Sequence, residues 1–268
     1  MKKLFITTLI LFGFIISTTD VLATWRHSSI SITILYDNYI FTKGLKADWG
    51  FSCLIEGTQE PVLFDTGFRE DTFRHNISIL NKDLNSVRHV VISHDHYDHT
   101  GNLLAFLKEN NNTVVYLPAS LQDDLYLKEI KATNAMVTPV LNPIEICQGV
   151  FLTGEMDSPV IKEQSMIIDT DRGLILIAGC AHPGIINIVR KAKNLLDKDI
   201  YLLIGGFHLL NESKINIVHL IGQLKKLGVL NIGPTHCTGD KAIALFKKEY
   251  GENYIQTGVG KTLELIRH

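Results

Sequence analysis

Histidine and aspartate, which bind transition metals, are concentrated in one short segment of the chain. Residues 89–102 read HVVISHDHYDHTGN, so a short apolar run of the buried-strand type is followed at once by three His and two Asp. In extended backbone His94 and His96 point to the same side and can bind one ion. Asp98 and His99 are adjacent and must diverge, which suits a second ion nearby. Imidazole and carboxylate ligands favour zinc, manganese or iron over calcium.

Three later turns each follow an apolar run and carry a His among glycines. They read GCAHPG at 179–184, GGFH at 205–208 and PTHCTG at 234–239. Glycine at such positions lets the backbone approach a bound group closely. These turns therefore add further candidate site residues, namely Cys180, His182, His208, His236 and Cys237.

Alternating strand-like and helical segments must position these turns. Strand-like runs are expected at 30–35, 51–55, 62–64, 90–93, 113–117, 166–168, 174–178, 200–204 and 229–232. Helices are expected at 101–108, 184–196, 212–227 and 240–250. No linker or repeat interrupts residues 24–268, which predicts one α/β domain made of two similar halves. We expect loops that set specificity within 41–50 and 120–163.

The N-terminus has the pattern of an export signal. Lys2 and Lys3 precede the apolar run 4–16, and Ala23 is a small residue at a plausible cleavage point. The run is short for a permanent anchor, which is the alternative, and no later stretch is long and apolar enough to span a bilayer. We therefore expect a signal peptide at 1–23, a periplasmic or secreted protein, and no stable membrane span after the signal is removed.

Composition excludes several classes of protein. With 46% hydrophobic and 20% charged residues, the 268-residue chain can bury a core and is not disordered. A net charge of −2 provides no basic surface for nucleic acid, so a small-molecule substrate is expected. The spacing of the four Cys fits neither a small disulfide scaffold nor a paired C-x-x-C zinc site.

The H-x-H-x-D-H run at 94–99 resembles the signature of the metallo-β-lactamase superfamily. LFDTG at 63–67 resembles the strand-Asp-x-Gly turn of that superfamily. The resemblance implies an α/β fold, the αββα sandwich, in which two mixed β-sheets lie face to face with helices outside and metals at one edge. It also implies two divalent metal ions, zinc in the first place, with manganese, iron or magnesium as alternatives.

The three later turns together resemble one branch of the superfamily. That branch is named for 7,8-dihydropterin-6-yl-methyl-4-(β-D-ribofuranosyl)aminobenzene 5′-phosphate synthase. The name implies the condensation of a dihydropterin diphosphate with an arylamine ribose phosphate.

The chain departs from the classical pattern of the superfamily. Where a classical member places its third metal His, before the strand at 174–178, this chain has Glu-Gln-Ser at 163–165. We expect His182 to replace that ligand. Cys180 stands where a metal-bridging Asp is common, and it is a thiolate ligand, a bystander or a disulfide partner of Cys237. The expected ligands are His94, His96, Asp98, His99, His182 and His236.

Three residues are expected to act beside the ions. Asp98 is the candidate catalytic residue, because it would hold one ion and could orient or shuttle a proton on a bridging water. Asp65 is expected to support the metal loop through hydrogen bonds rather than to bind metal directly. His208 is a candidate contact to a substrate phosphate or a support of the ligands, with a purely structural role as the alternative.

The export signal decides between the reactions considered. Pterin biosynthesis uses soluble phosphorylated intermediates that belong in the cytoplasm. We therefore expect an exported dinuclear-metal hydrolase that activates a metal-bound water on an ester, phosphoester or amide. The alternative is a synthase-like transferase, and a third hypothesis is a non-catalytic metal-binding protein. Classical β-lactam hydrolysis is not expected.

Overall fold

The computed structural model describes residues 29–121 and 124–265. The export signal expected at 1–23 lies outside the described residues, so export stays a prediction. In the described part of the chain, no helix is long and apolar enough to cross a bilayer.

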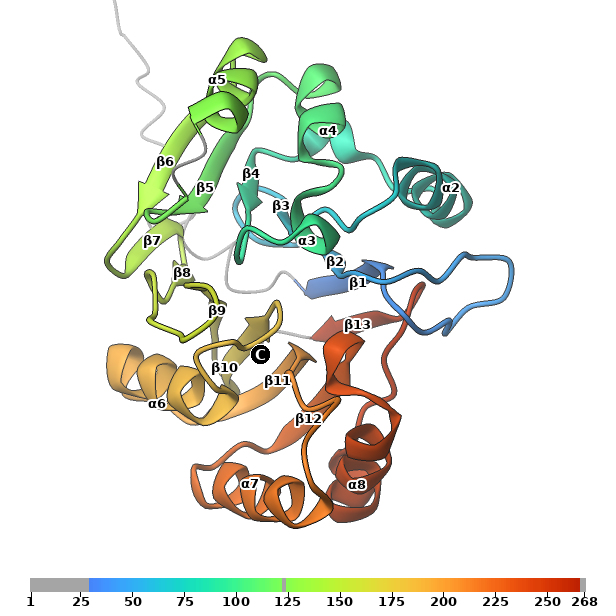
Figure 1. Ribbon diagram of the computed structural model, residues 1–268, viewed down its shortest axis with the longest axis vertical. Helices are drawn as coiled ribbons and strands as arrows, with labels where there is room; N and C mark the ends of the chain where they lie inside the picture. The colour runs from blue at the N-terminus through green and yellow to red at the C-terminus, as the bar shows by residue number, and fades with distance from the viewer. Residues whose placement is uncertain (1–28, 122–123, 266–268) are drawn as a thin grey trace, which may run out of the picture.

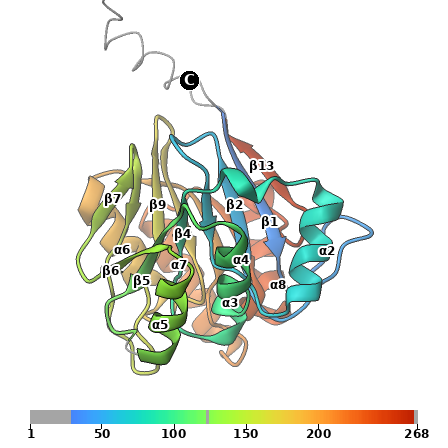
Figure 2. The same ribbon diagram turned by 90° about the horizontal axis from the view of Figure 1, so that it is seen from above.

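Two mixed β-sheets lie face to face, and helices cover their outer sides (Figures 1 and 2). The first sheet contains, in spatial order, β13 (Thr262–Leu265), β1 (Ile30–Tyr36), β2 (Ser52–Glu56), β3 (Val62–Phe64), β4 (His89–Val91), β5 (Val114–Pro118) and β6 (Met136–Val140). The second contains β12 (Asn231–Thr235), β11 (Ile200–Gly206), β10 (Gly173–Ala178), β9 (Met166–Thr170), β8 (Val150–Leu152) and β7 (Ile144–Cys147). The predicted αββα sandwich is confirmed.

Helices are divided between the two outer faces (Figure 1). The first sheet is covered by α2 (Glu70–Leu80), α3 (Tyr97–Thr100), α4 (Leu103–Glu109) and α5 (Asp124–Ala132). The second is covered by α6 (Ile185–Leu196), α7 (Lys214–Lys226) and α8 (Asp240–Tyr250). Short 3-10 turns are η1 (Leu84–Ser86), η2 (His236–Thr238) and η3 (Gly251–Asn253).

Three apolar layers hold this arrangement together. Between the sheets, side chains such as Phe64 and Ile175 are fully buried. Under the first set of helices, Leu103 packs with residues of β3 and β4, and under the second set Phe246 packs against β11 and β12 residues. Burial of each sheet on both faces explains the nearly continuous apolar runs of the central strands.

Parallel pairing gathers the ends of the key strands. In the first sheet β3, β4 and β5 are mutually parallel, and in the second β10, β11 and β12 are mutually parallel. The segments that leave these strands therefore meet at one edge of the sandwich. Most of the residues singled out in the sequence lie in those segments.

Several elements differ from the sequence prediction. The helix expected at 101–108 corresponds to α4, and a short helix that was not expected, α3, precedes it and contains Asp98 and His99. The region 120–163, expected to be loops, contains α5 and β6 to β8. These strands were missed because they are only three to five residues long, and β7, Ile-Glu-Ile-Cys, also carries an exposed charged side chain.

The layer between the sheets makes a direct stability prediction. Replacing the fully buried Ile175 by Ala leaves a cavity that the two sheets cannot close, so the free energy of unfolding should fall by about 2–5 kcal/mol. The control is Ile215→Ala on α7, where the side chain is 78% exposed and the change should stay within about 0.5 kcal/mol. Denaturant unfolding followed by circular dichroism measures both. Equal losses in the two variants would contradict this placement of the core.

Candidate metal centre

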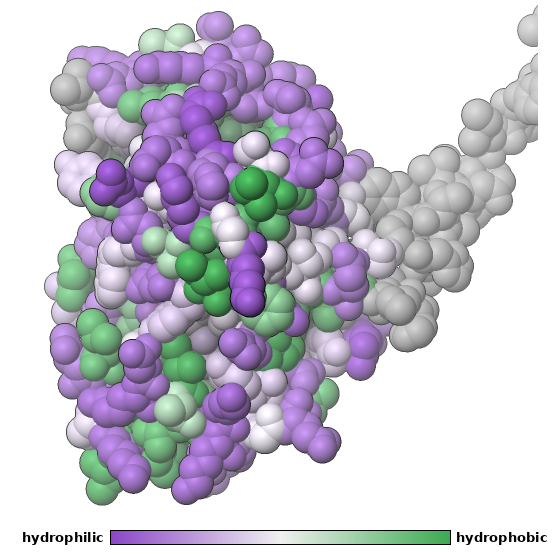
Figure 3. Space-filling model, turned by 90° about the vertical axis from the view of Figure 1, so that its right-hand side faces the viewer, coloured by the Kyte–Doolittle hydropathy of each residue, from purple (hydrophilic) through white to green (hydrophobic). Residues whose placement is uncertain are grey.

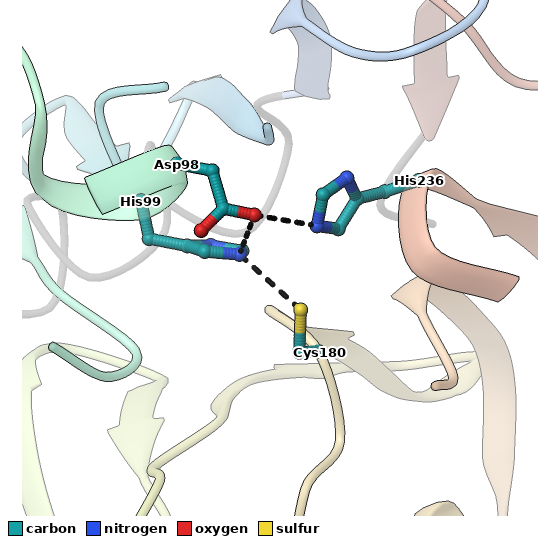
Figure 4. A group of neighbouring side chains, drawn as sticks. All are labelled: Asp98, His99, Cys180 and His236. Atoms are coloured by element: carbon teal, nitrogen blue, oxygen red, sulfur yellow. Dashed lines mark hydrogen bonds and ion pairs between the residues drawn. The ribbon is translucent and has the colours of Figure 1, made fainter. Parts of the chain in front are cut away.

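Four potential ligands from both sheets converge at the shared edge (Figure 4). Asp98 and His99 come from α3, Cys180 follows β10, and His236 follows β12. Asp98 Oδ2 lies 3.5 Å from His99 Nε2 and 3.3 Å from His236 Nε2, and Cys180 Sγ lies 3.3 Å from His99 Nε2. The ligand atoms of all four lie within 4.8 Å of one another.

A second group lies directly beside the first and shares Cys180 with it. The ligand atoms of His94, Cys180 and His182 lie within 4.8 Å of one another. His96 joins this group, because its Nδ1 is 3.0 Å from His94 Nε2 and its ring is 5.0 Å from that of His182. Each ligand that the sequence predicted therefore lies in one of two adjacent groups.

Asp65 lies behind the first group and forms hydrogen bonds with its loop. Its Oδ2 accepts hydrogen bonds from His99 Nδ1 at 2.7 Å and from Ser93 Oγ at 2.8 Å. Its Oδ1 accepts from Ser93 N–H at 2.7 Å. These bonds turn His99 Nε2 toward Asp98 and Cys180.

Glu163 supports the second group. From the sequence, its segment was notable only because it lacks the His that a classical member has there. Its fully buried carboxylate accepts hydrogen bonds from the backbone N–H of Cys180, Ala181 and His182, each at 2.9 Å. It also accepts from His182 Nδ1 at 2.8 Å. No sequence pattern signals this role, because the bonds join Glu163 to a turn 17 to 19 residues further along the chain.

Two further rings, those of His94 and His236, are oriented in the same way. Ser93 Oγ lies 2.8 Å from His94 Nδ1, and Asn38 Oδ1 lies 2.9 Å from His236 Nδ1. Asn38 Oδ1 also accepts from Gly50 N–H at 3.1 Å, which ties the loop after β1 to the centre. Asn38 carried no pattern that sequence analysis could have recognised.

The turns that carry these residues adopt unusual backbone conformations. Asp65, Ala181, His208 and His236 have φ between 50° and 59°, in the left-handed region that non-glycine residues rarely adopt. Such conformations persist where the surrounding structure enforces them, commonly at functional sites. A Cβ on Gly206 would lie 2.6 Å from Cys237 Sγ, so that position requires glycine for the turns to approach.

Neighbouring imidazoles keep two carboxylates of the site, those of Glu163 and Asp98, ionised. Burial disfavours charge on Glu163 and Asp98, but neighbouring His residues outweigh it and hold both pKa values below their usual range. Burial also disfavours the charged ring of His99, yet the Asp65 carboxylate outweighs it and raises the pKa of His99 to about 9. Burial, followed by the neighbouring rings, lowers the pKa values of His94 and His96, so both are neutral.

This donor set fits divalent transition metals. Imidazoles converge with a carboxylate and a thiol, which are ligands typical of zinc and its neighbours. Nε2 of His236 is buried and, among the described residues, has no well-aligned hydrogen-bond partner. Each group supplies at least three donors, and the side chains behind them orient the rings, as is usual around bound metals.

Cys180 and Cys237 are free thiols. Their ligand atoms lie within 4.8 Å of each other and of a His208 ring nitrogen. Burial raises the pKa of Cys180 well above its usual value. The position of Cys180 between both groups favours its role as a ligand among the three alternatives, and that role stays a prediction.

Comparison with known proteins identifies relatives over most of the chain. The family model described as "Metallo-beta-lactamase superfamily" matches residues 50–240. A 7,8-dihydropterin-6-methyl-4-(beta-D-ribofuranosyl)-aminobenzene-5'-phosphate synthase of Methanocaldococcus jannaschii is 28% identical, with 88% of this chain and 97% of the relative covered. An uncharacterized protein of the same organism is 31% identical, with 87% and 99% covered.

A solved structure supports the same superfamily assignment. The crystal structure of Tm1679, a metal-dependent hydrolase of the beta-lactamase superfamily, has a TM-score of 0.77 to this chain at 29% identity. It covers 88% of this chain and 99% of that one. The synthase and Tm1679 are both described as enzymes. The prediction that this chain is an enzyme is therefore supported, but these two relatives do not agree on the reaction.

The prediction of an exported hydrolase is wrong in its reaction. The curated relative with a named reaction is a synthase, which was the stated alternative, and hydrolysis is supported only at the level of the superfamily. The error has a physical reason. Two adjacent cations can activate a water or neutralise a leaving group equally well, so the ligands alone do not select the reaction.

The ligand assignment predicts specific losses of metal. His182→Ala should lower metal affinity about as much as His94→Ala, because each variant removes one imidazole from the same group. The control His75→Ala, on α2, should keep full metal content, because this half-buried ring bonds to Gly44 O and not to either ligand group. Elemental analysis of purified protein and competition with a chromogenic chelator measure these effects. Unchanged affinity in His182→Ala would refute its role as a ligand.

Glu163 generates a second prediction. In Glu163→Gln an amide NH₂ replaces one acceptor and faces backbone N–H donors, so the turn and His182 lose their orientation. Metal affinity should fall about 10- to 100-fold. The matched control is Glu109→Gln, whose carboxylate pairs with Arg74 at the surface and should leave affinity unchanged. The same chelator competition measures both variants, and equal affinities would contradict the supporting role of Glu163.

Proposed function

The chain belongs to the metallo-beta-lactamase superfamily, and we propose that within it the protein is a metal-dependent transferase that joins a dihydropterin methyl diphosphate to a ribofuranosylaminobenzene phosphate. The observation that carries this proposal is the match to a synthase of this name over 88% of the chain. The three turns at 179–184, 205–208 and 234–239, which distinguish this chain from the classical pattern, carry the resemblance to the same branch.

The proposed reaction is a substitution at a methylene carbon. The amine nitrogen of the aminobenzene forms a bond to that carbon while the bond from the carbon to a diphosphate oxygen breaks. Diphosphate leaves with the electron pair, and the amine loses one proton. The protein must therefore hold a highly anionic group, align the amine with the carbon, and receive a proton.

The two ligand groups would hold the cations. His94, His96 and His182 would surround one, Asp98, His99 and His236 the other, and Cys180 lies beside both. When bound, divalent cations neutralise the negative charge that builds up on a leaving diphosphate.

In this proposal Asp98 would receive the proton. Its side chain is 16% exposed, in contrast to the fully buried His99, so it faces the open side of the centre. Its lowered pKa keeps it ionised. A weak base suffices, because an alkylated arylammonium is itself acidic and gives up its proton readily.

His208 is placed to hold a phosphate oxygen. Its ring is exposed and lies 4.6 Å from that of His182. A hydrogen bond with Cys237 raises the pKa of His208, which favours the protonated ring and makes it a donor to anionic oxygen. The contact to a substrate phosphate that the sequence suggested for His208 therefore suits a substrate that carries a diphosphate.

A direct assay tests the proposal. Full-length protein loaded with zinc or manganese and supplied with both substrates should release inorganic diphosphate and form the condensed product, measured by mass spectrometry. Removing metal with a chelator should abolish the reaction, and adding metal back should restore it. Asp98→Asn should lower kcat at least about 100-fold, since it removes a metal ligand and the proton acceptor. Metal-loaded protein that forms no product would contradict the proposal.

A further inference from the structure

A pocket opens beside the metal centre, and none of the expected metal ligands lines it. It has a volume of about 220 Å³ and is lined by Trp49, His208, Leu210, Asn211, Glu212 and Cys237. Cys237 and His208 connect it to the centre, because their ligand atoms lie within 4.8 Å of that of Cys180. A molecule in this pocket would therefore lie next to the ions.

Trp49 provides an aromatic wall for the pocket. Its side chain is 47% exposed although it lies against the site, with its ring centroid 5.1 Å from that of His236. It belongs to the loop that leaves β1 on the right of Figure 1, the side on which Figure 3 shows apolar side chains among hydrophilic ones. A large exposed ring at such a position commonly marks a surface that binds a ligand.

Hydrogen bonds hold Trp49 in place. Its backbone N–H donates to Asp48 Oδ1 at 2.8 Å, and Asp48 Oδ2 accepts from the Tyr36 hydroxyl at 3.0 Å. On its other side, Gly50 donates to Asn38, which also binds His236. The backbone that carries Trp49 is therefore fixed relative to the metal centre, and the indole beside the His236 ring can serve as a platform for a flat ring.

Glu212 supplies a half-buried carboxylate on the same pocket. Its Oε2 accepts a hydrogen bond from Asn216 Nδ2 at 2.9 Å, and its backbone N–H donates to Leu209. Among the ion pairs of residues 29–121 and 124–265, none involves Glu212. Its negative charge is therefore not explained by a cation of the described chain.

A pterin ring matches this pair of features. Its 2-amino group and its N3–H are two parallel donors on one edge, which a carboxylate accepts together as it does the fork of a guanidinium. Its faces are flat and aromatic, so they stack on an indole.

We propose that Trp49 and Glu212 form the pterin-binding subsite, Trp49 by stacking on the ring and Glu212 by accepting from its 2-amino and N3–H groups. This inference rests on the proposed function, and it names the residues that would select the pterin substrate.

Binding of ring fragments tests this subsite without catalysis. Pterin and lumazine differ at position 2, where lumazine carries an oxygen that would repel a carboxylate. Full-length protein should bind pterin at least about tenfold more tightly than lumazine, measured by equilibrium dialysis. In Glu212→Gln the amide can donate to that oxygen and accept from N3–H. Pterin binding should therefore weaken about tenfold, and the preference should shift to lumazine.

Two further variants separate stacking from edge recognition. Trp49→Ala should weaken both fragments alike, about tenfold, while Trp49→Phe should retain most of the affinity. The control Glu252→Gln, at an exposed position on η3, should change neither affinity.

The outcomes distinguish this inference from the proposed function. Formation of product with an unchanged pterin preference in Glu212→Gln would overturn the subsite and leave the reaction standing. The reversed preference without any product would support the subsite and overturn the reaction. Protein that neither binds pterin nor forms product would overturn both.

Discussion

Imidazole rings can converge on one point only if something holds each of them from behind, and this requirement organises the edge of the sandwich. At four rings, one nitrogen faces the centre while the other is held by a hydrogen bond to an adjacent loop. The holding groups come from loops at different strand ends of both sheets. The centre can therefore form only when the two sheets are packed in their correct relative position. The pairs are His94 with Ser93, His99 with Asp65, His182 with Glu163, and His236 with Asn38.

Two of the holding groups are carboxylates in fully buried positions, which is costly unless every oxygen is satisfied. Asp65 and Glu163 meet this condition with hydrogen bonds from backbone N–H groups, a hydroxyl and imidazoles. The left-handed conformations of Asp65 and Ala181 bring the backbone into this arrangement. The supporting residues of the centre therefore belong to the buried interior of the protein. Through them, metal affinity depends on how the strand ends pack.

The sequence predicted the parts of this centre that follow local rules. His94 to His99 form a compact motif after a buried strand, and the glycine-flanked His182 and His236 stand at further strand ends, so parallel pairing brings them together. Asn38 and the role of Glu163 could not be predicted, because each acts on a residue distant in sequence. The strands within 120–163 were missed for a different reason, since their exposed, mixed composition lacks the alternation that identifies a strand.

The reaction was the hardest property to predict, and the geometry of the centre explains the difficulty. The ligands determine where charge is stabilised, whereas the surfaces on the open side determine which molecule receives that stabilisation. In a hydrolase that side must admit a water to the electrophile, and in a transferase it must hold a second organic molecule and exclude water. Trp49 lies in the segment 41–50, expected to set specificity, and Glu212 precedes α7 without any motif. Under the proposed function, selection of the pterin substrate would therefore depend on two residues that no sequence motif marks.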